Sequence, residues 1–561
     1  MNRSFFTRSI LVLIIFILVG MTLTACSTSD DNNEVDNENV ILSEKIVRIT
    51  AANTPIIDPC MAIDDADSIG VLNLYDSLVF PSHETKEPVP LLAEKWDISD
   101  DGMDYVFYLK RGAKFHNGKE VTASDVVFSA NRLLTMGEGF AYLFTDIVEE
   151  VTVEDDYKVK FSLKKPYPIF LQTLCRLYIL NEEQVMENLN PSGSYGEFGD
   201  YGREWLQTND AGSGPYMLSE IVQQEYLYAV KFDEWNGGSW DPDAPDGFKI
   251  IDTTEPTTVR VMMANRELEI TDKWQPTENI DAISKLPGIE VALFSTLANQ
   301  SMFYNTKKPP TDDVNFRKAL SCLFDYDMII EKVFPGSPRS YGPVPSDITG
   351  HVKTNQYHYD LEAAKEYLSK SKYADELSNY PVEILCNSDV PDHEKVALAL
   401  QFAAKQVGIT VVIDKAPWIS IVDRMSNIES TPNLLSMSLD AQVNDAGSML
   451  ETRYSTKTSG TIENGEWLLD KELDLRIEDA ILTLDEESRF EKYAELQHMI
   501  VEDMCPTAWL ADILSRVAYQ SEYMYWPVAE ASKEGNYISN LYGYHFYFHD
   551  MRIYPDKKLN K

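Results

Sequence analysis

The sequence predicts a mixed α/β protein built from two or three lobes, and three observations support this. The chain has 561 residues, which is more than one hydrophobic core usually serves. Segments typical of strands and of helices alternate irregularly along it, without an internal repeat. The clearest of them, residues 90–134, contains a strand, a loop and a capped helix in succession.

The strand and the helix of residues 90–134 are each preceded by a turn. Asp101 and Gly102 form a turn signal, and residues 105–109 (YVFYL) after it favour a strand. A second turn at residues 116–118 leads to Thr122 and Asp125, which have the spacing of a capping box with Asp in place of Glu or Gln. The helix that begins there carries an apolar face formed by Val126, Val127, Ala130, Leu133 and Leu134.

The amino terminus is typical of a secreted protein. Arg3 and Arg8 precede an uninterrupted apolar run over residues 10–19, which is too short to span a membrane. Residues 23–26 (LTAC) resemble a bacterial lipobox, in which the cysteine thiol is acylated. We therefore predict a signal peptide over residues 1–25 and a lipid anchor on Cys26. An ordinary signal peptide with a chance cysteine is the alternative.

Residues 26–44 are predicted to be a disordered acidic tether behind the lipidated Cys26. The stretch 27–39 has one apolar residue, Val35, and is rich in Asp, Glu and Asn, so it cannot bury enough surface to fold. The whole chain has a formal net charge of −41 at pH 7. Such a surface repels nucleic acid and an anionic bilayer, which argues against both as partners. It is compatible with cationic solutes and, more simply, with solubility outside the cell.

The other five cysteines are Cys60, Cys175, Cys322, Cys386 and Cys505. They lie far apart without a C-x-x-C pair, and an odd number leaves at least one thiol without an intramolecular disulfide. Disulfides are permitted outside the membrane, but their connectivity cannot be deduced from the spacing. Cys322 lies in a helical apolar pattern and is predicted to be a core residue.

Residues 90–134 closely resemble the signature of the family 5 extracellular solute-binding proteins. That family includes oligopeptide-, dipeptide- and nickel-binding components of ABC importers, and its pattern reads L-A-E-x-W, D-D-G, F-H-x-G and T-A-x-D-V-x-F-S. The matching segments here are 92–96, 100–102, 115–118 and 122–129. Further resemblances occur at residues 212–216, 233–238, 256–270, 303–320 and 359–365, where Leu361 replaces the proline of the family pattern.

The resemblance extends over about residues 45–525 and implies an α/β clamshell, with two lobes around a cleft and an extra domain inserted in the first lobe. The implied first lobe combines residues 45–88, 200–299 and 515–561, the insert is 89–199, and the second lobe is 300–514. The aromatic tail at residues 542–548 (YGYHFYF) is predicted to be a strand that joins an earlier sheet. His545 and His549 are then sheet residues rather than metal ligands.

No catalytic, metal or cofactor site is predicted. Residues 211–214 (AGSG) miss the first glycine of G-x-S-x-G, and Pro215 follows where a nucleophile-elbow helix should begin. His393 and Glu394 lack the second histidine of H-E-x-x-H.

The candidate ligand-binding residues come from the resemblance. Peptide binders of the family hold the peptide ammonium with the Asp of W-x-A-D-x-x-[D/E]-P, and residues 439–446 (LDAQVNDA) are the best match. Ala441 and Asp445 fit, whereas Gln442 stands in place of the Asp. Asp440, on the same face of an extended segment, is therefore the first candidate counter-ion and Asp445 the second. The resemblance also implies a ligand contact for Trp418, because peptide binders of the family have a Trp about two dozen residues ahead of the acid, in a segment like residues 416–421. The alternatives are a solvated loop acid for Asp440 and a core residue for Trp418.

The predicted function is that of a monomeric lipoprotein on the extracytoplasmic face of the membrane, in the periplasm or at the cell surface. It binds a peptide between its lobes and delivers it to the permease subunits of an ABC importer, without catalysis and without a cofactor. A receptor for an oligosaccharide or another solute is the first alternative. An extracytoplasmic enzyme or chaperone on the same fold is the second.

Overall fold

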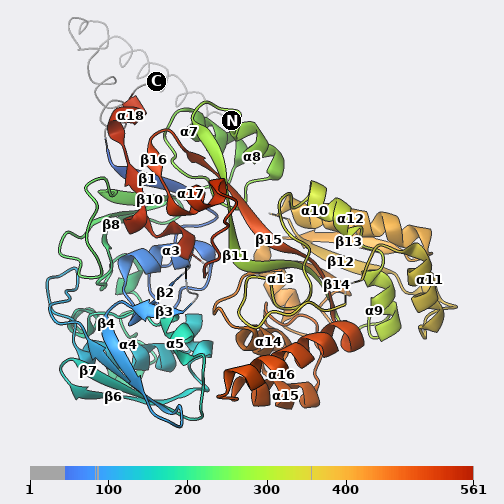
Figure 1. Ribbon diagram of the computed structural model, residues 1–561, viewed down its shortest axis with the longest axis horizontal. Coiled ribbons are helices and arrows are strands. Elements are labelled where there is room, and N and C mark those ends of the chain that lie inside the picture. Colours follow the sequence, from blue (N-terminus) through green and yellow to red (C-terminus); the bar gives the residue numbers. More distant parts are fainter. Residues whose placement is uncertain are drawn as a thin grey trace, which may run out of the picture.

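The computed structural model describes residues 44–559 except 83, 85, 86, 356, 389 and 542. The predicted signal peptide, Cys26 and the tether up to residue 43 lie outside this range. Within it, no helix combines the length and the apolar character needed to cross a membrane. Figure 1 shows two lobes side by side, with a smaller sheet-based region beneath the one that contains both ends of the described chain.

The first lobe is built on a four-stranded sheet with the order β1-β10-β9-β8, in which only the β1–β10 pair is parallel. Val47 and Ile49 of β1 are fully buried beneath the surrounding helices. A bridge joins Ile49 to Ile270, so the segment that follows residue 270 is held at the edge of this sheet. The elements are β1 (Ile46–Ala51), α3 (Asp65–Leu74), β8 (Tyr216–Val222), β9 (Tyr226–Lys231), β10 (Gly247–Asp252), α7 (Pro256–Ala264), α8 (Thr277–Ile283), β16 (Met524–Tyr525), α17 (Pro527–Lys533), β17 (Arg552–Ile553) and α18 (Pro555–Leu559).

The inserted region has its own antiparallel sheet, β4-β5-β7-β6, with α4 packed against it. The strand and helix predicted within residues 90–134 are confirmed, since β5 and α4 occupy those positions. The Asp125 carboxylate accepts the backbone N–H of Thr122 at 2.9 Å, so Asp serves in the capping box as predicted. The elements are β3 (Pro88–Pro90), β4 (Ala93–Ile98), β5 (Asp104–Leu109), α4 (Ala123–Met136), β6 (Val148–Asp155), β7 (Lys158–Leu163), α5 (Phe170–Thr173) and α6 (Glu182–Glu187). β2 (Val79–Pro81) precedes the predicted insert in the chain and pairs with β3.

The second lobe contains a five-stranded sheet, β13-β12-β14-β11-β15, flanked by helices. Its first three strands in that order are parallel to one another, and the remaining pairs are antiparallel. The elements are β11 (Ile289–Tyr304), α9 (Val314–Ser321), α10 (Tyr326–Lys332), α11 (Leu361–Lys370), β12 (Val382–Asn387), α12 (Pro391–Gln406), β13 (Val411–Ala416), α13 (Trp418–Met425), β14 (Leu434–Leu439), α14 (Ala446–Tyr454), α15 (Lys471–Ile481), α16 (Glu486–His498) and β15 (Thr507–Gln520).

Two long antiparallel strands, β11 and β15, connect the lobes (Figure 1). Tyr519 near the end of β15 bridges to Ile270 of the first lobe, while the start of β15 pairs with the end of β11 in the second. Their pairing is interrupted between Ser295 and Ala298, where Leu297 has a φ of +59°. The predicted boundaries 299/300 and 514/515 fall inside these two strands and remain a prediction.

The carboxy-terminal tail packs against the first lobe, but the prediction that it forms a strand is wrong. Residues 544–546 and 548–550 are short 3₁₀ turns that follow Gly543, whose φ is +87°. The Asn73 side chain donates to the carbonyl of Phe546 and accepts the N–H of Phe548, so these backbone groups need no sheet partner. The aromatic side chains are buried directly in the core, with Phe548 stacked on Phe248 at 4.3 Å.

The two histidines of the tail are consequently not sheet residues. His545 is buried and stacks on Phe294, with 4.3 Å between the ring centroids. His549 packs against Trp235 and Trp240. At the very end of the described chain, the fully buried Lys558 forms an ion pair of 2.7 Å with the fully buried Glu269.

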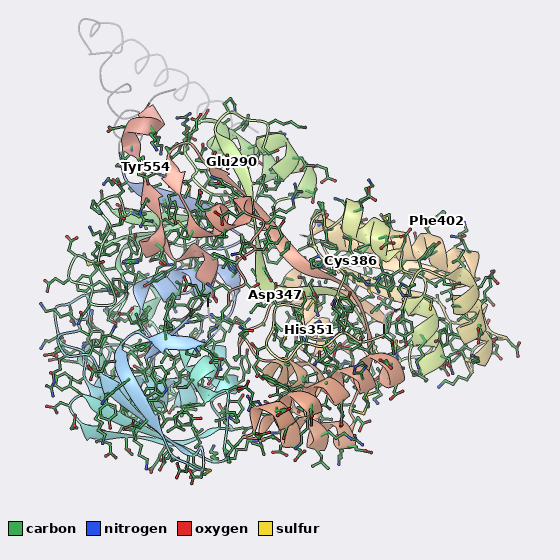
Figure 2. All side chains as sticks on the ribbon, in the orientation of Figure 1. Glu290, Asp347, His351, Cys386, Phe402 and Tyr554 are labelled. Carbon is green, nitrogen blue, oxygen red and sulfur yellow. The ribbon has the colours of Figure 1, made fainter. Side chains whose placement is uncertain are left out.

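All five cysteines of the described residues are buried and free. Cys322 is 4% exposed within the core of the second lobe, as its sequence pattern predicted. In Figure 2, Cys386 lies inside the same lobe, whereas Phe402 lies at its outer surface with 73% of its area exposed.

Candidate functional site

The second lobe presents the carboxyl ends of its three parallel strands at one edge. β12, β13 and β14 end there, and α12, α13 and the loop before α14 begin there. Ligands of open α/β sheets bind outside this edge, because the strand ends and the helix amino termini leave a crevice there. Topology therefore brings the start of α12, Trp418 and Asp440 to the same edge, although they lie far apart in the sequence.

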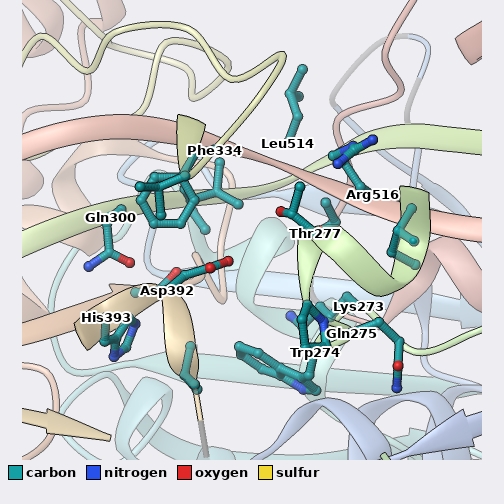
Figure 3. Close-up of a pocket in the computed structure, with 18 of the residues that line it drawn as sticks. Lys273, Trp274, Gln275, Thr277, Gln300, Phe334, Asp392, His393, Leu514 and Arg516 are labelled. Atoms are coloured by element: carbon teal, nitrogen blue, oxygen red, sulfur yellow. The ribbon is translucent and has the colours of Figure 1, made fainter. Parts of the chain in front are cut away.

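A cavity of about 100 Å³ lies between this edge and the first lobe (Figure 3). The first lobe contributes residues 273–277, and the second contributes residues 390–393, Ser438 and Asp440. β11 and β15 line the cavity with residues on both sides of the interruption at Ser295. Sites for drug-sized ligands usually enclose about 300–1,000 Å³, so the cavity in this form of the protein is smaller than such a ligand needs.

Asp440 is the predicted residue with the strongest interactions in this cavity. Its carboxylate lies 3.4 and 3.5 Å from Nζ of Lys273, which belongs to the first lobe. The same ammonium lies 3.6 Å from Asp65, in the first turn of α3. The Lys273 and Asp440 side chains are only 6% and 10% exposed, so this is a nearly buried ion pair across the two lobes. Burial raises the pKa of Asp65 to about 6.

Gln442 lines a small recess beside the cavity, of about 10 Å³, which it shares with Asp440 and Glu463. Oε1 of Gln442 is buried and has no hydrogen-bond partner among the described residues. Burial also raises the pKa of the Glu463 carboxyl. The recess is about the size of one water molecule or one ammonium group, and Arg453 lines it together with these three side chains.

The structure does not bring Asp445 and Trp418 to the cavity. Asp445 is buried and caps α14 by accepting the N–H of Gly447 at 2.7 Å. Burial raises its pKa to about 6. Trp418 is the first residue of α13 and is 40% exposed.

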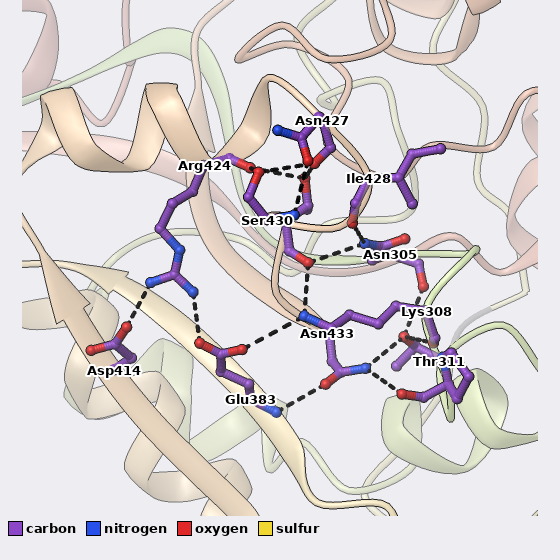
Figure 4. A network of polar contacts seen from close by, with 12 residues as sticks. Asn305, Lys308, Thr311, Glu383, Asp414, Arg424, Asn427, Ile428, Ser430 and Asn433 are labelled. Atoms are coloured by element: carbon purple, nitrogen blue, oxygen red, sulfur yellow. Dashed lines mark hydrogen bonds and ion pairs between the residues drawn. The ribbon is translucent and has the colours of Figure 1, made fainter.

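The helix that carries Trp418 is fixed to the sheet by Arg424. This guanidinium lies 2.6 Å from Asp414 of β13 and 2.6 Å from Glu383 of β12 (Figure 4). The network extends to Lys308, which contacts Glu383 at 3.7 Å. Trp418 is consequently held at the carboxyl edge of the sheet, outside the cavity lining.

Asp440 is the one predicted site residue in the cavity lining, and two of the residues that sequence reasoning missed are Lys273 and His393. Lys273 follows a segment that resembles the family, but nothing in its vicinity marks it as the partner of an acid 167 positions away. His393 was considered only as an incomplete zinc motif. It is 5% exposed and lines the cavity, its Nδ1 has no hydrogen-bond partner among the described residues, and burial lowers its pKa to about 4. A neutral imidazole therefore faces the cavity.

No group of His, Cys, Asp or Glu suited to a metal ion occurs in the described part of the chain.

Two α/β lobes joined by paired strands, with a cavity between them and an extra region inserted in the first, define a clamshell solute-binding protein. The sequence model of the bacterial extracellular solute-binding proteins, family 5 (middle), matches residues 87–461. The chain belongs to this family, as its sequence motifs indicated.

Relatives of known name match about four fifths of the chain. The chain is 26% identical over 464 residues to the probable D,D-dipeptide-binding periplasmic protein DdpA of Escherichia coli, covering 81% of this chain and 86% of the relative. It is 27% identical over 483 residues to the dipeptide-binding protein of the same organism, covering 80% and 84%. The solved structure of the Helicobacter pylori periplasmic binding protein DppA with the peptide STSA has a TM-score of 0.75 at 23% identity, covering 91% of this chain and 98% of that one.

Proposed function

We propose that this protein is a lipid-anchored receptor that captures a peptide in its interlobe cavity and delivers it to the permease of an ABC importer. The observation that carries the peptide proposal is the recess lined by the side-chain oxygens of Asp440, Gln442 and Glu463. The guanidinium of Arg453 also lines it, but it donates to Asn299, to the carbonyl of Pro343 and to the carbonyl of Leu439. The names of the relatives, which are dipeptide-binding proteins, support the same class of ligand. The protein acts as a monomer and catalyses no reaction.

The proposed mechanism is closure of the lobes around the peptide. A ligand that contacts both lobes only in the closed form shifts the equilibrium towards that form by its difference in affinity. The peptide ammonium enters a water-poor space and must meet a carboxylate there. Asp440 supplies that carboxylate, and Gln442 accepts a further hydrogen bond. Trp418, which lies outside the cavity lining in this form, stays a predicted ligand contact. Asp445 already caps a helix and is not retained in the binding site.

A non-peptide solute, such as an oligosaccharide, is the second candidate. Its support is the departure from the family's ammonium-binding motif, in which a neutral Gln442 stands in place of the acid. Asp440 is in addition already paired with Lys273.

Calorimetry with di- and tripeptides tests the peptide proposal. Asp440→Asn should weaken the binding of a peptide by several hundred-fold, since removing one member of a buried charge pair costs about 3–5 kcal/mol. Asp423→Asn, an exposed acid of the same lobe, is the control. Unchanged affinity in Asp440→Asn removes this residue from the site. Absence of peptide binding by the wild type favours another solute, and turnover of a bound compound would indicate an enzyme.

The membrane anchor has its own test. Cys26→Ala should release the protein from membranes or leave it uncleaved, because acylation requires the thiol. A variant that remains in the membrane fraction at mature size, and still needs detergent, contradicts the lipoprotein proposal.

A further inference from the structure

Lys273 is placed in the cleft as though it were the ammonium group of a ligand. It comes from the first lobe, lies within 3.4–3.5 Å of both oxygens of Asp440, and is 6% exposed. Asp65, from the first lobe as well, shares the same ammonium at 3.6 Å. The group therefore contains two carboxylates and one ammonium, and carries one excess negative charge when both acids are ionised.

A ligand ammonium would balance this group. With the ligand bound, two ammonium groups face two carboxylates, so Lys273 can pair with Asp65 while the ligand ammonium pairs with Asp440. Glu463 of the recess faces the cation of Arg453. Without Asp65, Lys273 and the ligand ammonium would therefore both depend on Asp440 in a nearly buried site, which is unfavourable because like charges repel strongly at low dielectric. Asp65 does not line the cavity or the recess, so its effect on the ligand would be indirect.

We propose that Lys273 is an internal counter-ion that holds the lobes together through Asp440, and that Asp65 takes it over when a ligand ammonium binds. Lys273 then competes with the ligand, and Asp65 is a positioning residue that sets affinity without touching it. The takeover by Asp65 rests on the proposed binding of an ammonium group at Asp440. The link between the lobes does not depend on which ligand binds.

The geometry separates this arrangement from an ordinary surface ion pair. Lys395 and Glu278 also join the two lobes, at 2.9 Å, but their side chains are 33% and 72% exposed. Exposed pairs contribute about 0–1 kcal/mol. Lys395→Met is therefore a matched control for the link between the lobes. Lys395 also pairs with Asp392 of the cavity lining at 2.9 Å, so Glu278→Gln, which breaks the same cross-lobe pair and leaves Asp392 paired, is the control for binding.

The test measures binding of L-Ala-L-Ala, trialanine and their N-acetylated forms by calorimetry. Lys273→Met should bind the free-amine peptides at least about 10-fold more tightly than the wild type, and Asp65→Asn at least about 10-fold more weakly. The double variant should regain the affinity lost in Asp65→Asn, because the competing cation is gone. Glu278→Gln should match the wild type, and N-acetylation should abolish the differences.

The opposite result is equally clear. If Lys273→Met weakens binding, or the double variant stays as weak as Asp65→Asn, Lys273 contacts the ligand directly and the proposal is wrong. Small-angle scattering without added peptide provides a measurement that needs no ligand, since Lys273→Met should increase the radius of gyration and Lys395→Met should not. An unchanged radius in Lys273→Met also overturns the proposal. If no peptide binds the wild type but Lys273→Met opens the lobes, the proposed peptide ligand fails while the link between the lobes stands.

Discussion

The first lobe has two interfaces that use the same chemistry in different geometries. Towards the insert, Arg132 of α4 forms two hydrogen bonds of 2.6 Å with Asp58, and both side chains are at most 3% exposed. Towards the second lobe, Lys273 reaches Asp440 at 3.4–3.5 Å and is shared with Asp65. A planar guanidinium bound by both oxygens of one carboxylate is held in a single geometry. An ammonium that lies between two carboxylates can instead pair with either of them.

This difference between the two interfaces predicts which parts of the molecule move as one body when the cleft opens. The insert and the first lobe are joined by short, buried hydrogen bonds. One more of these is the bond of 2.8 Å that Tyr544 of the tail donates to the carbonyl of Cys175. The two lobes are joined through pairs that are longer or more exposed. We therefore expect the insert to move with the first lobe as one body, and the cleft to open against the second.

Deleting the carboxy-terminal tail should destabilise the first lobe and its interface with the insert more than any other change. Truncation after Asn540 deletes Tyr544, Phe546 and Phe548, all at most 4% exposed, and burial of each contributes about 1.5–3 kcal/mol. It also leaves Glu269 without its partner Lys558. The melting temperature should fall by more than about 10 °C. Tyr537→Ala, at a position that is 40% exposed, is the control. An unchanged melting temperature would show that the tail is not part of the first lobe.

Arg132→Met should have the next largest effect. It leaves Asp58 buried without its cation, which typically costs about 3–5 kcal/mol of the free energy of unfolding. The control is Arg203→Met, which removes a pair with Glu138 whose side chains are 39% and 40% exposed, and should cost about 0–1 kcal/mol. Denaturant titration of both variants measures the contrast. If both variants lost the same free energy of unfolding, the buried Arg132–Asp58 pair would be no stronger than the exposed Arg203–Glu138 pair.

The smallest predicted effect is a pH dependence of the free energy of unfolding that comes from one buried acid. Burial raises the pKa of Asp76 to about 7, although Trp235 and Ser213 donate to it. The folded state therefore holds a proton that the unfolded state releases, so this group stabilises the protein at low pH, and the stabilisation is lost as the pH rises through 7. The free energy of unfolding should be on the order of 2 kcal/mol higher at pH 5.5 than at pH 8.5 from this group. Asp76→Asn should reduce that difference. If the slope is the same in the variant, other acids such as Glu466 account for it.

The sequence predicts local elements well where short-range signals determine them. The capping box of Thr122 and Asp125 and the strand before it depend on neighbours a few positions apart, and both are confirmed. The tail was misread because a run of aromatics fits a buried turn as well as a strand. What decides between them is Asn73, more than 470 positions away, which takes over the backbone hydrogen bonds.

The candidate site was predictable only in part for the same reason. The family motif led to residues 439–446 and hence to Asp440, which does line the cavity. Its partner Lys273 and the proposed accessory acid Asp65 come from two other segments that only the folded chain brings together. Asp445 fitted the motif better than Asp440, but its position at the start of α14 makes it a cap.

The buried pair between Glu269 and Lys558 sets a limit on the order in which the chain folds during synthesis. The sheet of the insert needs only residues 93–163, so it can form while later residues are still being added. The first lobe needs β1 from one end of the described chain and Lys558 from the other. Its core therefore closes only after residue 558 has been synthesised. Until then Arg48, at 3.5 Å, is the one cation paired with Glu269 among the described residues, and the apolar surface of the unfinished lobe stays exposed to aggregation.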